Sequence, residues 1–233
     1  MANLEPLIQS IPVAPLKLAS LEGCRTLADQ VNNYLVSFRH ESPTNVGQAD
    51  SLQGYCADSY LLECECPRFG SGEGKGVLKE SVRGCDLFIM VDVTNYSLTY
   101  RVNGYENHMS PDNHYQDLKR IISAADGKAR RINVIMPFLY EGRQHKRSKR
   151  ESLDCALMLQ ELVDMGVSNI LTFDAHDPRV SNSIPLHGFD SFMPTYQFLK
   201  ALVNSVPDFV IDNDHLMIIS PDEGAMGRAV YFS

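Results

Sequence analysis

The sequence predicts an α/β fold in which a mainly parallel sheet lies between helices on both faces. The order of the local patterns supports this three-layer prediction. From about residue 60, short apolar runs alternate with segments that carry apolar residues at helical spacing. This alternation favours parallel pairing, because a helix that connects two parallel strands crosses over the sheet. In such sheets, ligands bind beyond the carboxyl ends of the strands.

Each element is expected from its own local pattern. The helix over 152–165 has a capping residue in Ser152, an acidic first turn at Asp154 and Gly166 after its end. Two further segments have helical spacing, at 116–125 and 196–203. Buried strands are expected where the apolar runs are continuous, at 86–93, 132–136, 170–173 and 216–220.

The first 50 residues have a different pattern. Ala19–Phe38 carries apolar residues at helical spacing, and the polar stretch Arg39–Gln53 contains a proline and a glycine, which are typical of a linker. We therefore expect residues 1–50 to form an N-terminal helical extension and linker. We expect residues 51–233 to form one domain.

The composition is that of a soluble globular protein, with 44% apolar and 21% charged residues. The net charge of -8 repels phosphate over most of the surface, which argues against nucleic acid or a membrane as a partner. The six cysteines form no CxxC pair, and the first 20 residues lack the basic start and apolar run of a secretory signal. We expect reduced thiols and a cytoplasmic location.

Four loops carry residues suited to a nucleotide. In Arg68–Glu73, glycines allow close approach of the backbone and Phe69 offers a flat ring for stacking; a plain glycine-rich hairpin loop is the alternative. The segment Tyr140–Arg150 follows the strand at 132–136 and has five Lys or Arg within eight positions. It fits an anion site, and a solvated charged loop is the alternative.

The other two loops carry acids. Asp174–Asp177 follows the strand at 170–173 and contains His176, which suits a divalent cation; a structural histidine is the alternative. In Ser220–Ala229, Asp222 precedes a segment that can open a helix toward phosphate; a turn capped by Asp222 is the alternative. Together the four loops suit a magnesium nucleotide. The sequence has no GxxxxGK[ST] motif, so it is not a P-loop protein.

The order of five motifs resembles one family. Residues 80–89 read ESVRGCDLFI, which is similar to ESVRG-x-D-x-F-I of ribose-phosphate pyrophosphokinases, also called phosphoribosyl pyrophosphate synthetases. Residues 135–144 read IMPFLYEGRQ and resemble the family's IPYFGYARQD. FDAH at 173–176 resembles VDLHA, SPDEG at 220–224 resembles SPDxGG, and Arg150, Ser152 and Ala156 fall in its R-x-P-I-[ST]-A-K region. The resemblance covers about residues 62–229.

The resemblance implies a phosphoribosyltransferase-like, Rossmann-type fold and the ATP-binding half of a transferase. In the family, ribose 5-phosphate attacks the β-phosphorus of ATP and gives phosphoribosyl pyrophosphate and AMP, as part of nucleotide biosynthesis. Arg143 and His176 stand at catalytic positions. A homo-oligomer, either a dimer or a hexamer, is also implied. The residues that match the family's site are Phe69, Ser71, Gly72 and Glu73 for adenine and ribose, Arg143 and Gln144 for ATP, with Arg143 near the phosphates, and His176 and Asp222 for Mg²⁺.

Three residues depart from the family pattern. Ser71 stands where the family has Asp, His145 replaces the Asp of RQD, and Ala225 replaces the second glycine of SPDxGG. Residues 1–50 have no counterpart in the compact members. The family's Lys/Arg loop and TGGT segment do not follow before Ser233. We therefore expect the chain to lack the second domain and to be inactive alone.

Two other functions stay open. The changes at Ser71 and His145 favour a non-catalytic relative, which binds nucleotide or partner subunits and regulates a true synthetase. A relative in fold alone, with an unrelated ligand, is the other possibility. If the site is assigned correctly, the variants Arg143→Ala and His176→Ala lose affinity for Mg-ATP.

Overall fold

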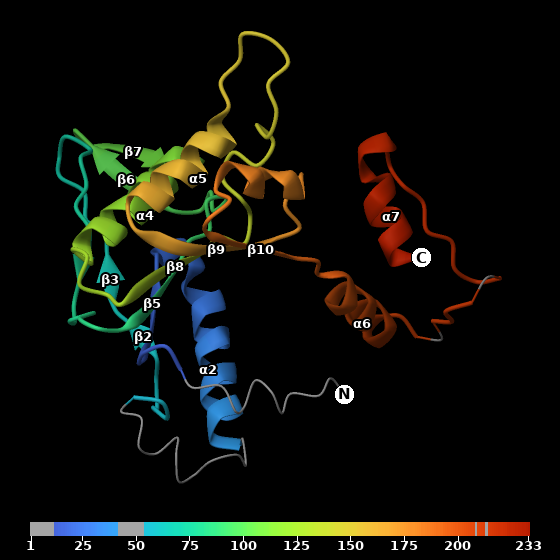
Figure 1. Cartoon of the computed structure of the whole chain (residues 1–233), viewed down its shortest axis with the longest axis horizontal. Helices are drawn as coiled ribbons and strands as arrows, with labels where there is room; N and C mark the ends of the chain where they lie inside the picture. Colours follow the sequence, from blue (N-terminus) through green and yellow to red (C-terminus); the bar gives the residue numbers. More distant parts are fainter. Residues whose placement is uncertain (1–11, 42–53, 208, 213) are drawn as a thin grey trace. The chain divides into compact units, whose positions relative to one another are not determined.

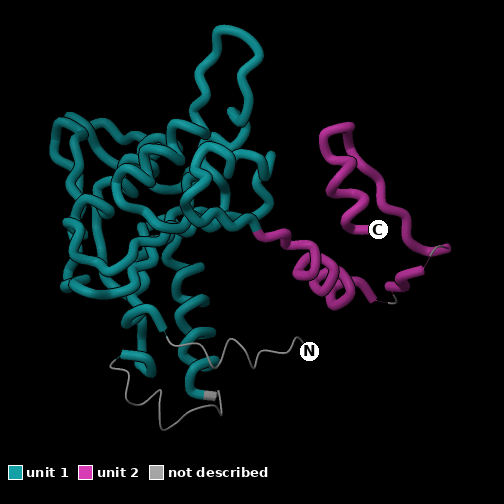
Figure 2. The backbone as a smooth tube through the Cα atoms, in the orientation of Figure 1, with its two compact units in different colours: residues 1–191 teal, residues 192–233 magenta. Residues whose placement is uncertain are grey.

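The computed structural model describes residues 12–41, 54–207, 209–212 and 214–233 (Figure 1). The chain divides into two compact units, residues 1–191 and 192–233 (Figure 2). Unit 1 holds the sheet and the helices around it. Unit 2 contains α6 (Thr195–Ser205), the 3-10 turn η3 (Glu223–Ala225) and α7 (Met226–Phe232).

A six-stranded sheet forms the centre of unit 1, in the order β10-β9-β8-β5-β1-β2. β1 pairs in parallel with β2 and β5, β5 pairs in parallel with β8, and β8 with β9. The mainly parallel sheet expected from the sequence is therefore confirmed. The strands are β1 (Leu16–Ser20), β2 (Leu61–Leu62), β5 (Asp86–Met90), β8 (Arg131–Ile135), β9 (Val167–Phe173) and β10 (Gly188–Phe192).

Helices cover both faces of the sheet, as the sequence predicts (Figure 1). On one face, α2 buries Ala28 in a cluster with Leu18 and Met90. On the other face, α4 and α5 contribute to the larger core, which includes Leu87 and Val134. Because successive strand residues point to opposite faces, β5 supplies side chains to both layers. The helices are α2 (Arg25–Glu41), α4 (Pro111–Ala124) and α5 (Asp154–Asp164).

Most of the expected elements are present. The strands expected at 86–93, 132–136 and 170–173 are β5, β8 and β9, and the three expected helices are α4, α5 and α6. α4 begins before residue 116 because Ser110 and Asn113 form a capping box and Pro111 occupies the first turn. α5 begins at Asp154, and Ser152 is not its cap, since the Ser152 hydroxyl donates to the Asp154 carboxylate instead.

Two element predictions are wrong. The helix expected at Ala19–Phe38 begins only at Arg25, because Leu16–Ser20 is a strand between β2 and β5 and Glu22–Cys24 is a 3-10 turn, η1. β1 and α2 both lie within the first 50 residues and form part of unit 1. The apolar run at 216–220 forms no strand, because no described segment pairs with it to complete its backbone hydrogen bonds. The linker expected at 39–53 lies mainly outside the described residues.

Two small antiparallel pairs accompany the parallel sheet. β3 (Cys64–Glu65) pairs with β4 (Val77–Leu78), and β6 (Thr99–Val102) pairs with β7 (Tyr105–His108). The β6–β7 hairpin turns at Asn103 and Gly104, whose φ angles are 49° and 87°. Positive φ at both central residues indicates a type I′ turn, for which Asn-Gly is a preferred sequence.

The cysteines are free thiols, as their spacing led us to expect. Burial raises the pKa of Cys24, Cys64 and Cys155 to about 11, because the interior disfavours a thiolate. No helix in the described ranges combines the length and the apolar character that a bilayer span requires.

Candidate functional site

The basic loop, defined here as Arg143–Arg150, leaves the sheet beside the loop that follows β9. β8 and β9 are parallel neighbours, so their carboxyl ends meet at one edge. Backbone hydrogen bonds from Met136 N to Leu171 O and from Phe173 N to Pro137 O continue the pairing up to that edge. The sheet therefore brings two of the four candidate loops together.

His145 joins these two loops. Its ring centroid lies 5.0 Å from that of His176, with the ring planes tilted by 52°. Its Nε2 lies 3.6 Å from Asp177 Oδ2, and both of these side chains are only 12% exposed. Its Nδ1 lies 3.2 Å from the carbonyl oxygen of Arg143. His145 thus links the backbone that carries Arg143 to the residues that follow β9.

Asp177 is already paired with an arginine. Its carboxylate accepts hydrogen bonds from the backbone N and the guanidinium of Arg179. These bonds hold the pKa of Asp177 well below its usual range, so the carboxylate is charged at neutral pH. Within the described ranges, no three His, Cys, Asp or Glu side chains gather into a group that could hold a metal ion. A metal here would need ligands from elsewhere.

Both loops contain a strained residue shortly after the strand. Glu141 has φ of 54° and Asp174 has φ of 41°. The left-handed conformation costs residues that carry a Cβ about 1–2 kcal/mol each. Burial raises the pKa of Glu141, and the nearby Asp154 and Asp112 carboxylates raise it further. Strain of this kind is concentrated at ligand sites, where the surrounding structure fixes the turn.

A pocket of about 260 Å³ opens beside Arg143. Its walls come from the segment after β5, the first residue of α4 and the loop after β8. Tyr140 is fixed in this wall, because its ring stacks on Tyr115 at 4.6 Å and its hydroxyl donates to Asp112 Oδ1 at 2.6 Å. The lining residues are Val93, Thr94, Pro111, Phe138, Tyr140, Glu141, Gly142 and Arg143.

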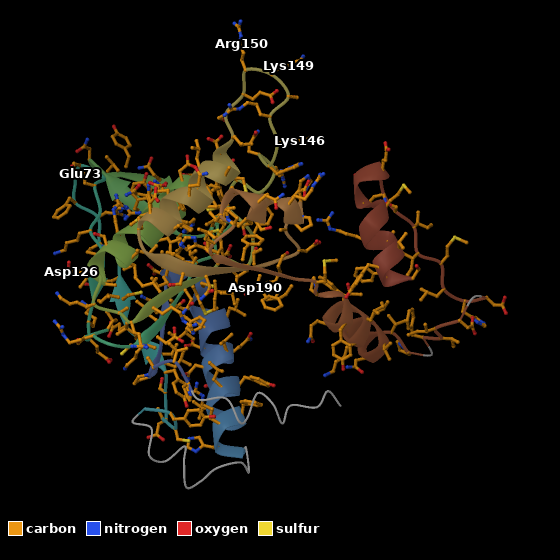
Figure 3. The ribbon with its side chains drawn as sticks, in the orientation of Figure 1. Glu73, Asp126, Lys146, Lys149, Arg150 and Asp190 are labelled. Carbon is orange, nitrogen blue, oxygen red and sulfur yellow. The ribbon has the colours of Figure 1, made fainter. Side chains whose placement is uncertain are left out.

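The rest of the basic loop projects into solvent. Gln144, Lys146, Arg147, Lys149 and Arg150 are all exposed. Figure 3 shows Lys146, Lys149 and Arg150 on a loop that extends away from the sheet and its helices. The alternative of a solvated charged loop therefore fits the tip, whereas at the base His145 contacts the loop after β9 and the Arg143 side chain is exposed.

The Arg68–Glu73 loop is a tight turn held by its own bonds. Phe69 N donates to Glu73 O at 2.7 Å, and Gly72 N donates to Phe69 O at 2.9 Å. Ser71 Oγ donates to Glu73 Oε2 at 2.8 Å. The Phe69 ring is 54% exposed, so a face of the ring is accessible to a ligand. The backbone therefore agrees with the alternative of a plain glycine-rich loop. The exposed Phe69 side chain is nevertheless compatible with stacking on a nucleotide base.

The described contacts within unit 1 do not join all of its candidate residues. In the described part of the chain, no hydrogen bond, ion pair or ring contact joins the Phe69–Glu73 loop to Arg143 or His176. Figure 3 shows Glu73 and Lys146 on different parts of unit 1. Asp222 belongs to unit 2, where its Oδ1 accepts a hydrogen bond from Ala225 N and caps η3. The structure thus joins Arg143 to His176 through His145 and leaves the Phe69 loop elsewhere.

Sequence reasoning gave no role to two residues of this site. His145 stood out only as a substitution, and Asp177 only as part of a strand-end segment. Their contact follows from the pairing of β8 with β9, which no local pattern specifies. The available signal was their position, since Asp177 lies four residues after Phe173, the end of one buried apolar run, and His145 lies nine residues after Met136, the end of another.

Comparisons with known proteins agree on one family. The sequence profile for the N-terminal domain of ribose phosphate pyrophosphokinase matches residues 16–166, so the match begins at the first residue of β1. The chain is 28% identical over 173 residues to a ribose-phosphate pyrophosphokinase of Staphylococcus epidermidis, covering 72% of this chain and 48% of that protein. It is 27% identical over 220 residues to one of Corynebacterium ammoniagenes, covering 92% of this chain and 55% of that protein. The chain spans about half the length of these relatives.

A solved structure shares the fold. The crystal structure of phosphoribosylpyrophosphate synthetase from Mycobacterium smegmatis has a TM-score of 0.70 to this chain, with 21% identity, and the match covers 93% of this chain and 59% of that one. The α/β, phosphoribosyltransferase-like fold expected from the sequence is therefore confirmed. Because the matched profile covers more than half of its residues, the chain belongs to the ribose-phosphate pyrophosphokinase family.

Proposed function

We propose that this chain is the Mg-ATP-binding half of a ribose-phosphate diphosphokinase that acts in cytoplasmic nucleotide biosynthesis. The observation that carries the proposal is the link from Arg143 through His145 to His176 at the carboxyl edge of β8 and β9. In a chain of this family, that edge is where a phosphorylated ligand is expected. The enzyme transfers diphosphate from ATP to ribose 5-phosphate and gives phosphoribosyl pyrophosphate and AMP.

The proposed reaction is a displacement at phosphorus. The anomeric oxygen of ribose 5-phosphate bonds to the β-phosphorus, and the bond from that phosphorus to the oxygen shared with the α-phosphate breaks. AMP leaves with the electron pair, and the hydroxyl proton passes to water. Such a transfer depends on in-line positioning and on cations near the charged oxygens, without a protein nucleophile. Arg143, at the base of the basic loop, and the exposed Gln144 next to it are the proposed phosphate contacts.

Magnesium enters with the nucleotide in this proposal. Mg²⁺ keeps several water ligands and binds through one or two protein groups together with phosphates. A site whose described residues offer no cluster of three ligands fits a metal that arrives on ATP. We assign His176 as a protein group that contacts this ion directly or through water. Asp222 is the second expected group, by resemblance alone.

A second copy of the chain is the proposed source of the adenine-binding loop. Within one chain, no described contact joins Phe69 to Arg143 or His176. In a homo-oligomer, the Phe69–Glu73 loop of one copy can meet the basic loop of another, so that adenine and phosphates of one ATP contact two subunits. This arrangement agrees with the oligomer that the family resemblance implies.

Titration with Mg-ATP tests the site. Arg143→Ala and His176→Ala each lower the affinity by about tenfold, which corresponds to about 1.4 kcal/mol. Arg130→Ala is the matched control, because Arg130 is exposed just before the amino end of β8, whereas Arg143 follows its carboxyl end. His187→Ala, which removes an exposed imidazole between η2 (Pro178–Ser183) and β10, controls for His176. Equal Mg-ATP affinity in the wild type and all four variants would contradict the assignment of Arg143 and His176 to the site.

A regulatory relative is the second candidate. The Ser71–Glu73 hydrogen bond favours it, because Ser71 stands where the family has Asp and its hydroxyl engages the Glu73 carboxylate within the loop. An assay of the natural full-length protein with Mg-ATP and ribose 5-phosphate separates the two. Phosphoribosyl pyrophosphate formation supports the transferase. Nucleotide binding without product, together with a changed activity of a synthetase added to the same mixture, supports the regulator.

A further inference from the structure

The β6–β7 hairpin touches the Arg68–Glu73 loop at three points. Asn103 N donates to Gly70 O at 3.1 Å. The guanidinium carbon of Arg68 lies 5.4 Å from the centre of the Tyr100 ring. A Cβ added to Gly72 would lie 2.9 Å from Val102 Cγ2, so Val102 fills the space that any larger residue at 72 needs. The start, middle and end of the loop are therefore each in contact with the hairpin.

The stem of this loop is fixed on α4. Arg68 donates to both oxygens of Asp117, at 2.6 and 2.7 Å, and Arg120 donates to Asp117 Oδ1 at 2.6 Å. The Asp117 side chain is only 6% exposed, so water screens these ion pairs weakly. Arg68 is thus held independently of the hairpin. Residues 69–73 lie beyond Arg68. In addition to the hydrogen bonds within the loop, they are supported by contacts with the hairpin.

The hairpin has a rigid base of its own. Asn95 Oδ1 accepts hydrogen bonds from Ser97 N and Leu98 N, and Asn95 O lies 2.6 Å from His114 Nε2 of α4. Met109 N donates to Leu98 O at 2.9 Å and closes the two strands. Of the described residues, none in 99–108 belongs to the hydrophobic core. The hairpin strands therefore lie outside the hydrophobic core of the sheet, whereas they contact the loop.

We propose that the β6–β7 hairpin positions the Phe69–Glu73 loop and so sets its affinity for the nucleoside part of the nucleotide. The inference rests on the proposed function, in which Phe69 stacks on adenine. A loop that is fixed before binding loses less conformational entropy when the ligand arrives. No hairpin residue lines the pocket beside Arg143, so the hairpin acts on nucleoside recognition and leaves phosphate recognition unchanged.

Three variants test the inference. Val102→Ala removes the methyl groups that face Gly72. A second variant replaces residues 99–108 by Asn-Gly, a change that the backbone permits, because Leu98 O and Met109 N already bond as they would across a two-residue turn. Glu106→Gln is the control, since Glu106 is exposed and pairs with Arg101, on the opposite face of the hairpin from Val102.

Each variant is titrated with Mg-ATP and with Mg-tripolyphosphate, which has no nucleoside. We expect Val102→Ala to weaken Mg-ATP binding about threefold and the hairpin replacement to weaken it about tenfold or more, with Mg-tripolyphosphate affinity unchanged. Hydrogen exchange at the Phe69 and Gly72 amides should speed up in both variants, because their bonds within the loop open more often. Glu106→Gln should match the wild type in all three measurements.

Three outcomes would overturn the inference. The first is unchanged Mg-ATP affinity in both hairpin variants with wild-type exchange at Phe69 and Gly72. The second is a parallel loss of Mg-tripolyphosphate affinity, which would indicate general damage to the fold. The third is a wild-type chain that does not bind Mg-ATP, which would overturn the proposed function as well. The first two leave the proposed function standing, so the two failures are distinguishable.

Discussion

The His145 and His176 rings lie 5.0 Å apart, although each belongs to the loop of a different strand. Their contact depends on the parallel pairing of β8 with β9, which sets the two loops side by side. Through His145 Nδ1, the same ring is also in contact with the backbone of Arg143. A residue that follows β9 therefore contacts the ring that in turn contacts the backbone of the proposed phosphate-binding arginine.

His145→Ala should weaken Mg-tripolyphosphate binding about threefold to tenfold, because Arg143 loses a support and must be ordered by the ligand. The His145→Ala/His176→Ala double variant should lose less affinity than the sum of the two single losses, since each single change already breaks the contact. Calorimetric titration measures the affinities of the two single variants and the double variant, with His187→Ala as the matched imidazole control. Strictly additive losses would show that the two rings act independently.

Asp177→Asn should reduce the loss of stability on acidification. The hydrogen bonds from Arg179 hold the pKa of Asp177 below its usual value of 3.8. A carboxyl whose pKa is depressed in the folded state stabilises the fold above the unfolded pKa, and that contribution is lost as pH falls through the folded pKa. Wild type should therefore lose more stability than the variant between about pH 5 and about pH 2. Urea unfolding at a series of pH values measures this difference, and identical acid profiles would contradict it.

Asp117→Asn should lower the free energy of unfolding by about 3–5 kcal/mol, the usual effect of removing one partner of a buried ion pair. The variant leaves Arg68, whose side chain is 10% exposed, and Arg120 without their shared carboxylate. Lys79→Ala removes the exposed pair between Lys79 and Glu65 and should leave the urea midpoint close to wild type. If both variants shift the urea midpoint equally, burial does not determine how much these ion pairs contribute to stability.

The elements that the sequence predicted well are those with a local pattern. The continuous apolar runs of β5, β8 and β9 and the helical spacing of α4 and α5 can each be recognised without knowledge of the rest of the chain. β1 was missed because Leu16–Ser20 is short and runs directly into a segment with helical spacing. Only its pairing with β2 and β5, far along the sequence, makes it a strand.

The candidate site, like the fold, could be predicted from the sequence only where a local pattern indicates it. The proximity of the loops that carry Arg143 and His176 could be predicted from the sequence, because residues beyond the carboxyl ends of parallel strands share one edge. The contact of His145 with Asp177 depends on which strands are neighbours, and the contact of the Phe69–Glu73 loop with the β6–β7 hairpin depends on packing between segments that are far apart in the sequence. Neither contact is visible in a local pattern, so both required the structure.

Alkylation at about pH 8 should separate the cysteines by burial, because the thiolate is the reactive form. Burial raises the pKa of Cys24, Cys64 and Cys155 to about 11, and burial with the nearby Asp117 charge raises that of Cys66 to about 12. Cys56 is exposed and should react first with iodoacetamide. Peptide mass spectrometry of native and urea-unfolded protein gives the order. Early labelling of Cys155 in the native protein would contradict the buried position of α5.

Gly72→Ala should destabilise the fold through two separable effects. Its φ of 91° costs an alanine about 1–2 kcal/mol, and the added Cβ meets Val102 Cγ2 at 2.9 Å. Gly84→Ala is the matched control for the first effect, because Gly84 has φ of 70° but no atom within 4 Å of the added Cβ. Urea unfolding should therefore show a larger loss for Gly72→Ala than for Gly84→Ala.

The Gly72→Ala/Val102→Ala double variant separates the two effects. Removing the Val102 methyl groups relieves the collision but leaves the unfavourable φ, so the double variant should lose less stability than the sum of its single changes. Its Mg-ATP affinity should stay below that of the wild type, because the truncated Val102 no longer holds the loop. Exact additivity in the unfolding free energies would mean that Gly72 and Val102 are not in contact, and the hairpin would then not support the loop at Gly72.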